Sequence, residues 1–184
     1  MSDSTEDSLD ELSRTLVQRL RAGDDAAGEA LENLHRARLQ RFAGRYLRNV
    51  HDAEDAVQES FARILSSDAE PRDFRVWSYR IARNVCLNAL RSSGARRDGA
   101  RLSTHFDAQA EQTGALTRLV RAEDGAALGE LLARLSESQR EVLTLRYLEG
   151  LGREEIAAVL EVPLSVVKSR LFEGVSRLRE LGAQ

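Results

Sequence analysis

The sequence predicts an all-α protein built from two small helical domains joined by a flexible linker. Good helix formers (Ala, Leu, Glu and Arg) are abundant, and only 2 of the 184 residues are Pro. Apolar residues recur at helical spacing, without a strong run of alternating β-branched residues. A stretch of scattered Gly, Ser and Thr interrupts this pattern. We therefore place the domains at residues 1–92 and 119–184, and the linker at residues 93–118.

Two amphipathic helices are expected at the start of the first domain. The first should run from near Ser8 to Gly23 and the second should start after Asp24, because glycine often ends a helix and aspartate often precedes one. The apolar stripe of the first helix is Leu9, Leu12, Leu16 and Leu20. That of the second is Leu31, Leu34, Leu39, Phe42 and Leu47. Both stripes are predicted to face the core.

The stretch DAEDAVQESFARI, residues 52–64, predicts a third helix with an acidic outer side. One side carries apolar residues, namely Ala53, Val57, Phe61, Ile64 and the following Leu65. Asp52, Asp55 and Glu59 fall on the opposite side. Such a stripe either keeps the helix soluble or matches a basic surface on a partner protein.

Pro71 and its polar neighbours end this pattern, and a fourth helix is predicted from FRVWSYRIARNVCLNALR, residues 74–91. Trp77, Arg80, Asn84 and Arg91 fall on one stripe of it. An unstacked base is held by an aromatic ring, hydrogen-bonding groups and positive charge. In the alternative interpretation, Trp77 belongs to the core and the arginines form a solvated face.

The second domain, with helices from near Leu119, contains a helix-turn-helix pattern. Ser136 and Gln139 match a capping box that starts a helix ending near Gly150. The helix REEIAAVL follows, then the turn EVP and the longer helix LSVVKSRLFEGVSRLREL. The residues expected to pack between the helices are Ile156, Ala157, Leu160, Val162, Val167 and Leu171.

The outward side of the last helix suits the major groove of DNA. Lys168, Ser169, Phe172 and Ser176 share this side, flanked by Arg170 and Arg177. Phe172 could contact thymine methyl groups, the polar side chains could contact base edges, and the arginines could grip phosphates. The alternative is a bundle helix whose exposed Phe172 docks on a partner protein.

Composition excludes several other classes of function. The net charge is −3, but acids gather near the start and at residues 52–59, whereas eight arginines between residues 72 and 101 form a candidate phosphate-binding tract. The single Cys86 and the three histidines show no metal-ligand spacing, and no Gly-rich phosphate loop or nucleophile–base pair is present, so we expect no cofactor, no metal and no enzymatic activity. No signal peptide or membrane-spanning run is found, so a cytoplasmic protein without membrane insertion is expected.

Taken in order, these motifs resemble a known family. DAEDAVQESFARI, FRVWSYRIARNVCLNALR, a polar linker and LSESQREVLTLRYLEGLGREEIAAVLEVPLSVVKSRL look like the two helical domains of extracytoplasmic-function (ECF) sigma factors. The likeness runs from about Ala22 to Leu181. It implies that the first domain is similar to sigma region 2 and the second to sigma region 4.

The resemblance also implies partners and site residues. The partners would be core RNA polymerase, through its β′ clamp helices and β flap, promoter DNA and an anti-sigma factor. The polymerase-binding residues would be Asp52, Asp55, Gln58 and Glu59. Those for the −10 element would be Trp77, Arg80, Arg83 and Asn84. Those for the −35 element would be Arg146, Lys168, Ser169, Arg170 and Phe172.

This sequence departs from the family pattern in two places. After VKSRLF the family usually has a basic, a small and a basic residue, but here Glu173, Gly174 and Val175 follow. Glu173 could lower −35 affinity by repelling phosphates, or it could accept a hydrogen bond from a cytosine amino group. The loop SSDAEPRD lacks the base-pocket residue that family members often carry there. The resemblance therefore leaves the base preference at the −10 element open.

An autonomous helix-turn-helix regulator is the competing hypothesis to a sigma factor. Such a regulator would bind duplex DNA unaided and would need neither the acidic stripe nor the stripe from Trp77 to Asn84. The presence of both stripes favours the sigma factor.

Overall fold

The computed structural model describes residues 3–47, 49–92 and 132–182, and all regular structure in these ranges is helical. The predicted all-α fold is therefore confirmed for the described residues. The chain divides into an N-terminal unit, residues 1–96, and a C-terminal unit, residues 97–184. The predicted linker, residues 93–118, lies outside the described residues, as do residues 119–131 of the predicted second domain.

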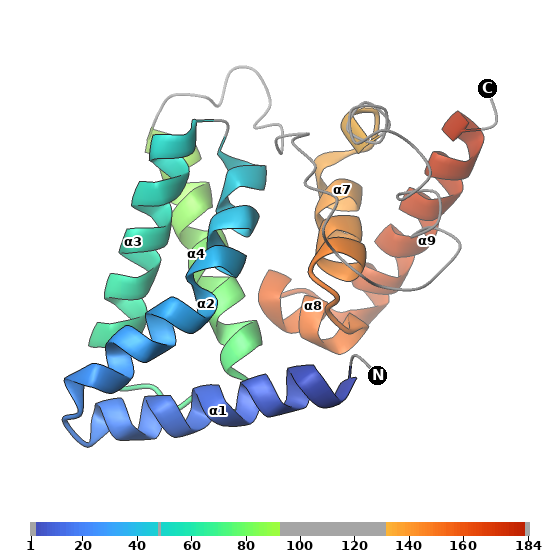
Figure 1. Cartoon of the computed structure of the whole chain (residues 1–184). Coiled ribbons are helices and arrows are strands. Elements are labelled where there is room, and N and C mark those ends of the chain that lie inside the picture. Colours follow the sequence, from blue (N-terminus) through green and yellow to red (C-terminus); the bar gives the residue numbers. More distant parts are fainter. Residues whose placement is uncertain (1–2, 48, 93–131, 183–184) are drawn as a thin grey trace. The chain divides into compact units, whose positions relative to one another are not determined.

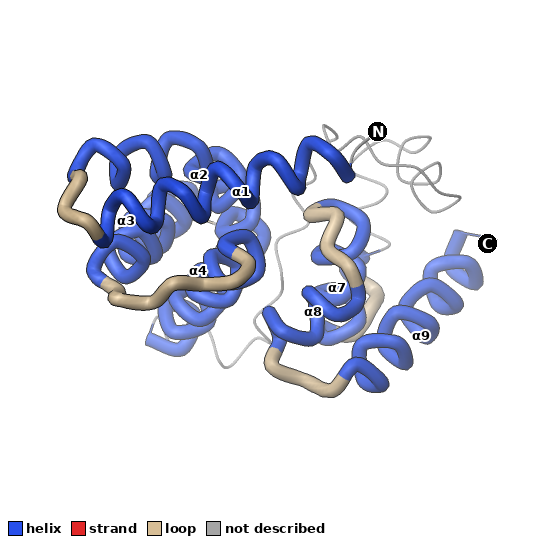
Figure 2. Tube along the Cα trace, turned by 90° about the horizontal axis from the view of Figure 1, so that it is seen from below, coloured by secondary structure: helices blue, strands red, loops and turns tan. Residues whose placement is uncertain are grey.

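The described part of the N-terminal unit consists of four helices: α1 (Asp3–Arg21), α2 (Asp25–Tyr46), α3 (Val50–Ser66) and α4 (Phe74–Ser92). Helices α2, α3 and α4 pack against one another, and α1 lies along α2 (Figures 1 and 2). Local signals set the helix boundaries. Gly23 has a φ of 89° in the turn after α1, and the Asn49 side chain accepts a hydrogen bond from the backbone N–H of His51 at the start of α3.

The core of this unit is aromatic. Phe42 is fully buried, with its ring centroid 4.9 Å from that of Tyr79 in an edge-to-face arrangement and 5.0 Å from that of Tyr46. Phe61 and Phe74 are also buried. Because α2, α3 and α4 all contribute rings, the surfaces of α3 and α4 that face away from the core are held on a rigid support.

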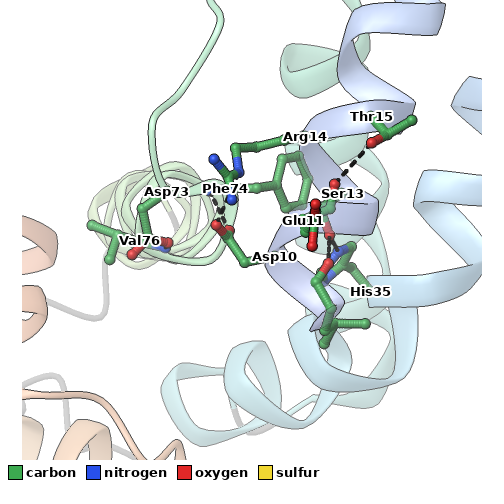
Figure 3. Close-up of polar contacts among 10 residues, drawn as sticks. Asp10, Glu11, Ser13, Arg14, Thr15, His35, Asp73, Phe74 and Val76 are labelled. Atoms are coloured by element: carbon green, nitrogen blue, oxygen red, sulfur yellow. Dashed lines mark hydrogen bonds and ion pairs between the residues drawn. The ribbon is translucent and has the colours of Figure 1, made fainter. Parts of the chain in front are cut away.

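Helix α1 is joined to α2 and α4 by polar contacts, which Figure 3 shows. The buried Ser13 hydroxyl lies 2.7 Å from His35 Nε2 of α2 and donates to the backbone oxygen of Leu9 at 2.6 Å. Asp10 Oδ1 accepts a hydrogen bond from the backbone N–H of Phe74, the first residue of α4, at 3.0 Å. This contact satisfies a donor that the helix itself leaves unpaired.

The Ser13 contact also corrects one sequence prediction. Leu12 was expected in the apolar stripe of α1, but its side chain is 47% exposed. The buried side of the helix instead carries Ser13, Leu16 and Val17. Helical periodicity alone favoured leucine over serine, because it could not reveal the buried histidine that gives Ser13 a partner.

We expect Asp10→Ala to lower the free energy of unfolding by about 1–2 kcal/mol, because it removes the acceptor for the Phe74 N–H at a helix start. Urea unfolding followed by circular dichroism would measure this. The matched control is Glu11→Ala, an exposed acid on the next residue, which should change stability by less than about 0.5 kcal/mol. Equal effects of the two substitutions would contradict a specific role for Asp10.

The described part of the C-terminal unit contains α7 (Glu137–Leu143), a π-helical turn η2 (Thr144–Leu148), α8 (Arg153–Leu160) and α9 (Leu164–Gly182). The predicted capping box is confirmed: the Ser136 hydroxyl accepts from the Gln139 N–H, and Gln139 Oε1 accepts from the Ser136 N–H. Glu161, with a φ of 56°, and Pro163 form the tight turn between α8 and α9. This turn is the tan segment joining the two helices in Figure 2.

Helices α7 and α8 both pack against α9. Ile156, Val159 and Leu160 of α8 are buried, and so are Val167 and Leu171 of α9. The predicted helix-turn-helix is therefore present, with one side of α9 left exposed.

Candidate functional site

The acidic stripe, defined as Asp52, Asp55, Gln58 and Glu59, lies on the exposed side of α3. All four side chains are exposed, whereas Ala53, Val57 and Phe61 of the same helix are buried. Glu59 pairs with Arg63 at 2.5 Å. Asp52 and Asp55 form no ion pair with any described residue. Most of the uncompensated negative charge of the stripe thus lies at its N-terminal end.

Helix α4 places Arg80, Arg83 and Asn84 on its partly exposed side, away from the buried Ala82 and Val85. Arg91 is exposed further along the helix, and its guanidinium donates to Asn88 at 2.8 Å. These groups give α4 a surface with hydrogen-bond donors and positive charge.

Trp77 differs from the other members of the predicted α4 stripe. It is only 9% exposed, and its ring packs edge-on against Phe74 with the centroids 5.8 Å apart. A base stacks on an open ring face. The burial of Trp77 leaves little of its ring open to a base. We therefore assign Trp77 to supporting the α4 surface rather than to stacking on a base.

Helix α9 presents the predicted recognition residues together. Lys168, Ser169 and Phe172 are exposed and Arg170 is partly exposed. The Phe172 side chain is 75% exposed, which is unusual for a large apolar group. Because α9 is a regular helix held by two others, Lys168, Ser169 and Phe172 form one face about one turn long, and Arg170 lies on its flank.

A basic cleft with a volume of about 410 Å³ lies on one flank of this face. Leu171, Phe172 and Val175 supply its apolar part. Four cationic side chains line it: Arg146, Arg153, Lys168 and Arg179. Arg146 also donates from Nη1 to the backbone oxygen of Leu151 at 2.8 Å, which fixes its position before α8. Positive charge beside an exposed aromatic ring suits a phosphate backbone next to an apolar contact.

The cleft contains residues that the sequence analysis missed. Arg179 lies two turns after Phe172 on the same side of α9, so helical spacing could have revealed it. Tyr147 of η2 and Arg153, the first residue of α8, line the same cleft as α9 because of how these elements pack. No local sequence signal predicts that packing.

The described residues contain neither a metal-binding cluster nor a membrane-spanning helix. Within residues 3–47, 49–92 and 132–182, no cluster of three or more His, Cys, Asp or Glu side chains is arranged to hold a metal ion. In the same ranges no helix combines the length and apolar character needed to cross a membrane.

Comparison with known proteins identifies the family. The model for Sigma-70 region 2 matches residues 31–96, and that for Sigma-70 region 4 matches residues 125–178. Among solved structures, CnrH in complex with the cytosolic domain of CnrY has a TM-score of 0.66 at 24% identity, covering 92% of this chain and 96% of that one. The sigma factor RpoE in complex with the anti-sigma factor NepR from Bartonella quintana has a TM-score of 0.58 at 24% identity, covering 83% and 94%. These two likenesses support the fold.

Sequence relatives support the same assignment. The ECF RNA polymerase sigma-E factor of Salmonella typhimurium strain LT2 is 33% identical over 169 residues, covering 86% of this chain and 88% of that protein. The ECF RNA polymerase sigma factor SigW of Bacillus subtilis is 28% identical over 181 residues, covering 89% and 93%. The resemblance predicted from the motifs is confirmed: this chain belongs to the family of ECF RNA polymerase sigma factors.

Proposed function

We propose that the N-terminal unit of this sigma factor docks on core RNA polymerase and captures the −10 strand, while the C-terminal unit reads the −35 duplex. The observation that carries this division is the opposite character of two exposed surfaces. The α3 stripe is acidic, and the α9 face is basic with an exposed aromatic ring. The first repels DNA phosphates and the second attracts them.

The acidic stripe on α3 is proposed to meet the β′ clamp helices of the polymerase. Asp52 and Asp55 supply the charge, and Gln58 and Glu59 extend the contact by one turn. Opposite charges across such an interface favour encounter and orientation more than affinity alone. The C-terminal unit would add a second polymerase contact, at the β flap.

The α4 surface is proposed to hold the non-template strand of the −10 element. Arg80 and Arg83 would contact phosphates, and Asn84 would hydrogen-bond to a base. Binding of flipped bases and single strand offsets the few kcal/mol that each unstacking step costs. DNA can therefore open without nucleotide hydrolysis. The chemistry of RNA synthesis belongs to the polymerase, and the sigma factor itself is not an enzyme.

The α9 face is proposed to enter the major groove of the −35 element. Lys168 and Ser169 reach base edges, Phe172 contacts a thymine methyl group, and the flanking arginines bind phosphates. The arginines proposed to bind phosphates are Arg146, which lines the basic cleft, and Arg170 on α9. The exposure of Phe172 supports this assignment, because an apolar ring in water gains from contact with an apolar partner.

An inhibitory partner is part of the same proposal. CnrH and RpoE were solved in complex with CnrY and with the anti-sigma factor NepR, respectively. We propose that an anti-sigma factor covers the polymerase- and DNA-binding surfaces of this chain in unstressed cells. The protein would act in the cytoplasm, where core polymerase and promoters are found.

The test combines gel shift and abortive transcription on the native upstream region of a target gene. Three samples are compared: the protein alone, core polymerase alone, and the mixture. We expect only the mixture to bind, open the promoter and make RNA. If the protein alone binds duplex DNA tightly and adds nothing to core polymerase, it is an autonomous regulator and the proposal is wrong.

A further inference from the structure

Glu173 is an exposed acid on α9 whose carboxylate is held on both sides. It lies one turn after Ser169 and directly after Phe172. Its Oε2 accepts a hydrogen bond from Gln139 Nε2 of α7 at 3.3 Å, and its Oε1 accepts one from the Ser169 hydroxyl at 3.4 Å. These two contacts orient the carboxylate on the surface of α9.

The orientation of the Gln139 amide follows from the capping box. Its Oε1 accepts from the Ser136 N–H at 3.3 Å, so its amide nitrogen is the atom left to face Glu173. An amide nitrogen can only donate and an ionised carboxylate can only accept. The start of α7 thus fixes the direction of a donor that holds an acid on α9.

Gly174 explains why α7 comes close enough for this contact. A Cβ atom added at residue 174 would lie 3.0 Å from Leu143 Cδ1 and 3.5 Å from Gln139 Cβ. A Cβ atom at this contact would require the Leu143 side chain to move by a few tenths of an ångström, so the glycine lets α7 pack closely on α9. The unusual pair Glu173–Gly174 is therefore one structural unit: the glycine admits α7, and α7 positions the glutamate.

Glu173 lies outside the basic cleft, on the flank of the α9 face where Arg170 and Arg177 lie one turn before and after it. The cations Arg146, Arg153, Lys168 and Arg179 line the basic cleft, and Glu173 is not among the residues that line it. A carboxylate against the DNA backbone is repelled. Its favourable partner in the groove is therefore a hydrogen-bond donor on a base edge.

The four bases differ in what they offer such an acceptor. In the major groove cytosine presents its N4 amino donor, whereas guanine presents two acceptors, and thymine an acceptor and a methyl group. Adenine places its amino donor beside the acceptor N7, which repels a carboxylate. Each oxygen of Glu173 receives one recorded hydrogen bond and has capacity for a second.

We propose that Glu173 is a specificity-determining residue that selects cytosine at one position of the −35 duplex. It accepts a hydrogen bond from the N4 amino group and excludes guanine by repelling its O6 and N7. This inference rests on the proposed placement of α9 in the major groove. It gives the departure of this chain from the usual basic residue a function in base selection.

The experiment is abortive transcription by the full chain with core polymerase on a promoter library with a fixed −10 element and a randomised −35 element. The wild type should favour cytosine over guanine at one position by about tenfold. Glu173→Gln should reduce this preference and admit adenine, and Glu173→Arg should move it to guanine, because arginine pairs with guanine O6 and N7. Glu180→Gln, an exposed acid on the same helix, is the matched control and should keep the cytosine preference.

Gln139→Glu tests the positioning step. Glutamate keeps the capping box but replaces the amide donor by a second acid, so the Glu173 carboxylate should be displaced. We expect the cytosine preference to fall by about threefold, with an unchanged requirement for the −10 element. If the wild type selects a −35 sequence but the Glu173 variants keep the same preference at every position, this inference is wrong and the proposed function stands. If no position upstream of the −10 element shows any preference, the placement of α9 fails, and this inference fails with it.

Discussion

Replacing Asp55 by arginine is expected to weaken binding to core RNA polymerase by about 100-fold, because like charges brought together in an interface cost several kcal/mol. Asp55 lies in the middle of the acidic stripe and is exposed. Glu59, one turn later, is already paired with Arg63 within the protein. Asp55 therefore carries more of the charge that is available to a partner than Glu59 does.

The measurement is a fluorescence titration of the labelled sigma factor with core polymerase at two salt concentrations. Asp55→Asn should have a smaller effect than Asp55→Arg, because it removes the attraction without adding repulsion. Higher salt should narrow the difference between wild type and variants. The matched control is Glu29→Arg, which makes the same charge change at an exposed position of α2.

Neither Asp55→Arg nor the control Glu29→Arg is expected to change the fold. Both positions are exposed, and exposed substitutions away from special contacts change stability by less than about 0.5 kcal/mol. Thermal unfolding curves of the variants should therefore overlap. If Asp55→Arg binds core polymerase as the wild type does, the acidic stripe is a solvated face and the docking proposal is wrong.

The acidic stripe could be predicted from the sequence because it depends only on local geometry. Residues three and four positions apart share a helix face whatever the helix packs against. Several helix boundaries were predictable for the same reason, although α1 begins at Asp3 and not near Ser8 as predicted. Asn49 at the start of α3, Gly23 after α1 and the Ser136–Gln139 capping box all act within a few residues of the boundary that they set.

Features that depend on packing between helices could not be predicted in this way. Leu12 is exposed because Ser13 takes the buried position opposite His35, which lies 22 residues away. Trp77 is buried because its ring packs on Phe74 within the assembled core. The Gln139–Glu173 contact joins residues 34 positions apart. Each of these depends on which helices meet, and helical periodicity contains no information on that.

The largest loss of stability is expected from Phe42→Ala, at about 3–5 kcal/mol, which is comparable to the whole stability of many small domains. Phe42 is fully buried, and its ring meets those of Tyr46 and Tyr79. Removal of the ring leaves a cavity that three helices cannot close without moving. Phe172→Ala is the matched control, since the same atoms are lost from a side chain that is 75% exposed.

Cys86 gives this prediction a direct readout within the N-terminal unit. The thiol is fully buried, and burial raises its pKa to about 12. In the unfolded chain the pKa of a cysteine is about 8.5. Alkylation by iodoacetamide at pH 8 should therefore be slow in the wild type and in Phe172→Ala, and fast in Phe42→Ala. Equal alkylation rates in Phe42→Ala and the wild type would contradict the predicted unfolding.

The raised pKa of Cys86 also determines how the stability of the N-terminal unit depends on pH. Burial favours the neutral thiol, so the unfolded chain releases its proton first as the pH rises. The stability contribution of Cys86 is fully present below about pH 8.5, and it is lost as the pH rises from there toward 12. Alkaline solution should therefore lower the stability of the wild type as well, in addition to the loss that Phe42→Ala causes. Because α3 and α4 rest on the core that Phe42 completes, this substitution should abolish polymerase binding together with the protection of Cys86. Asp55→Arg should instead weaken polymerase binding by about 100-fold and leave the protection of Cys86 intact.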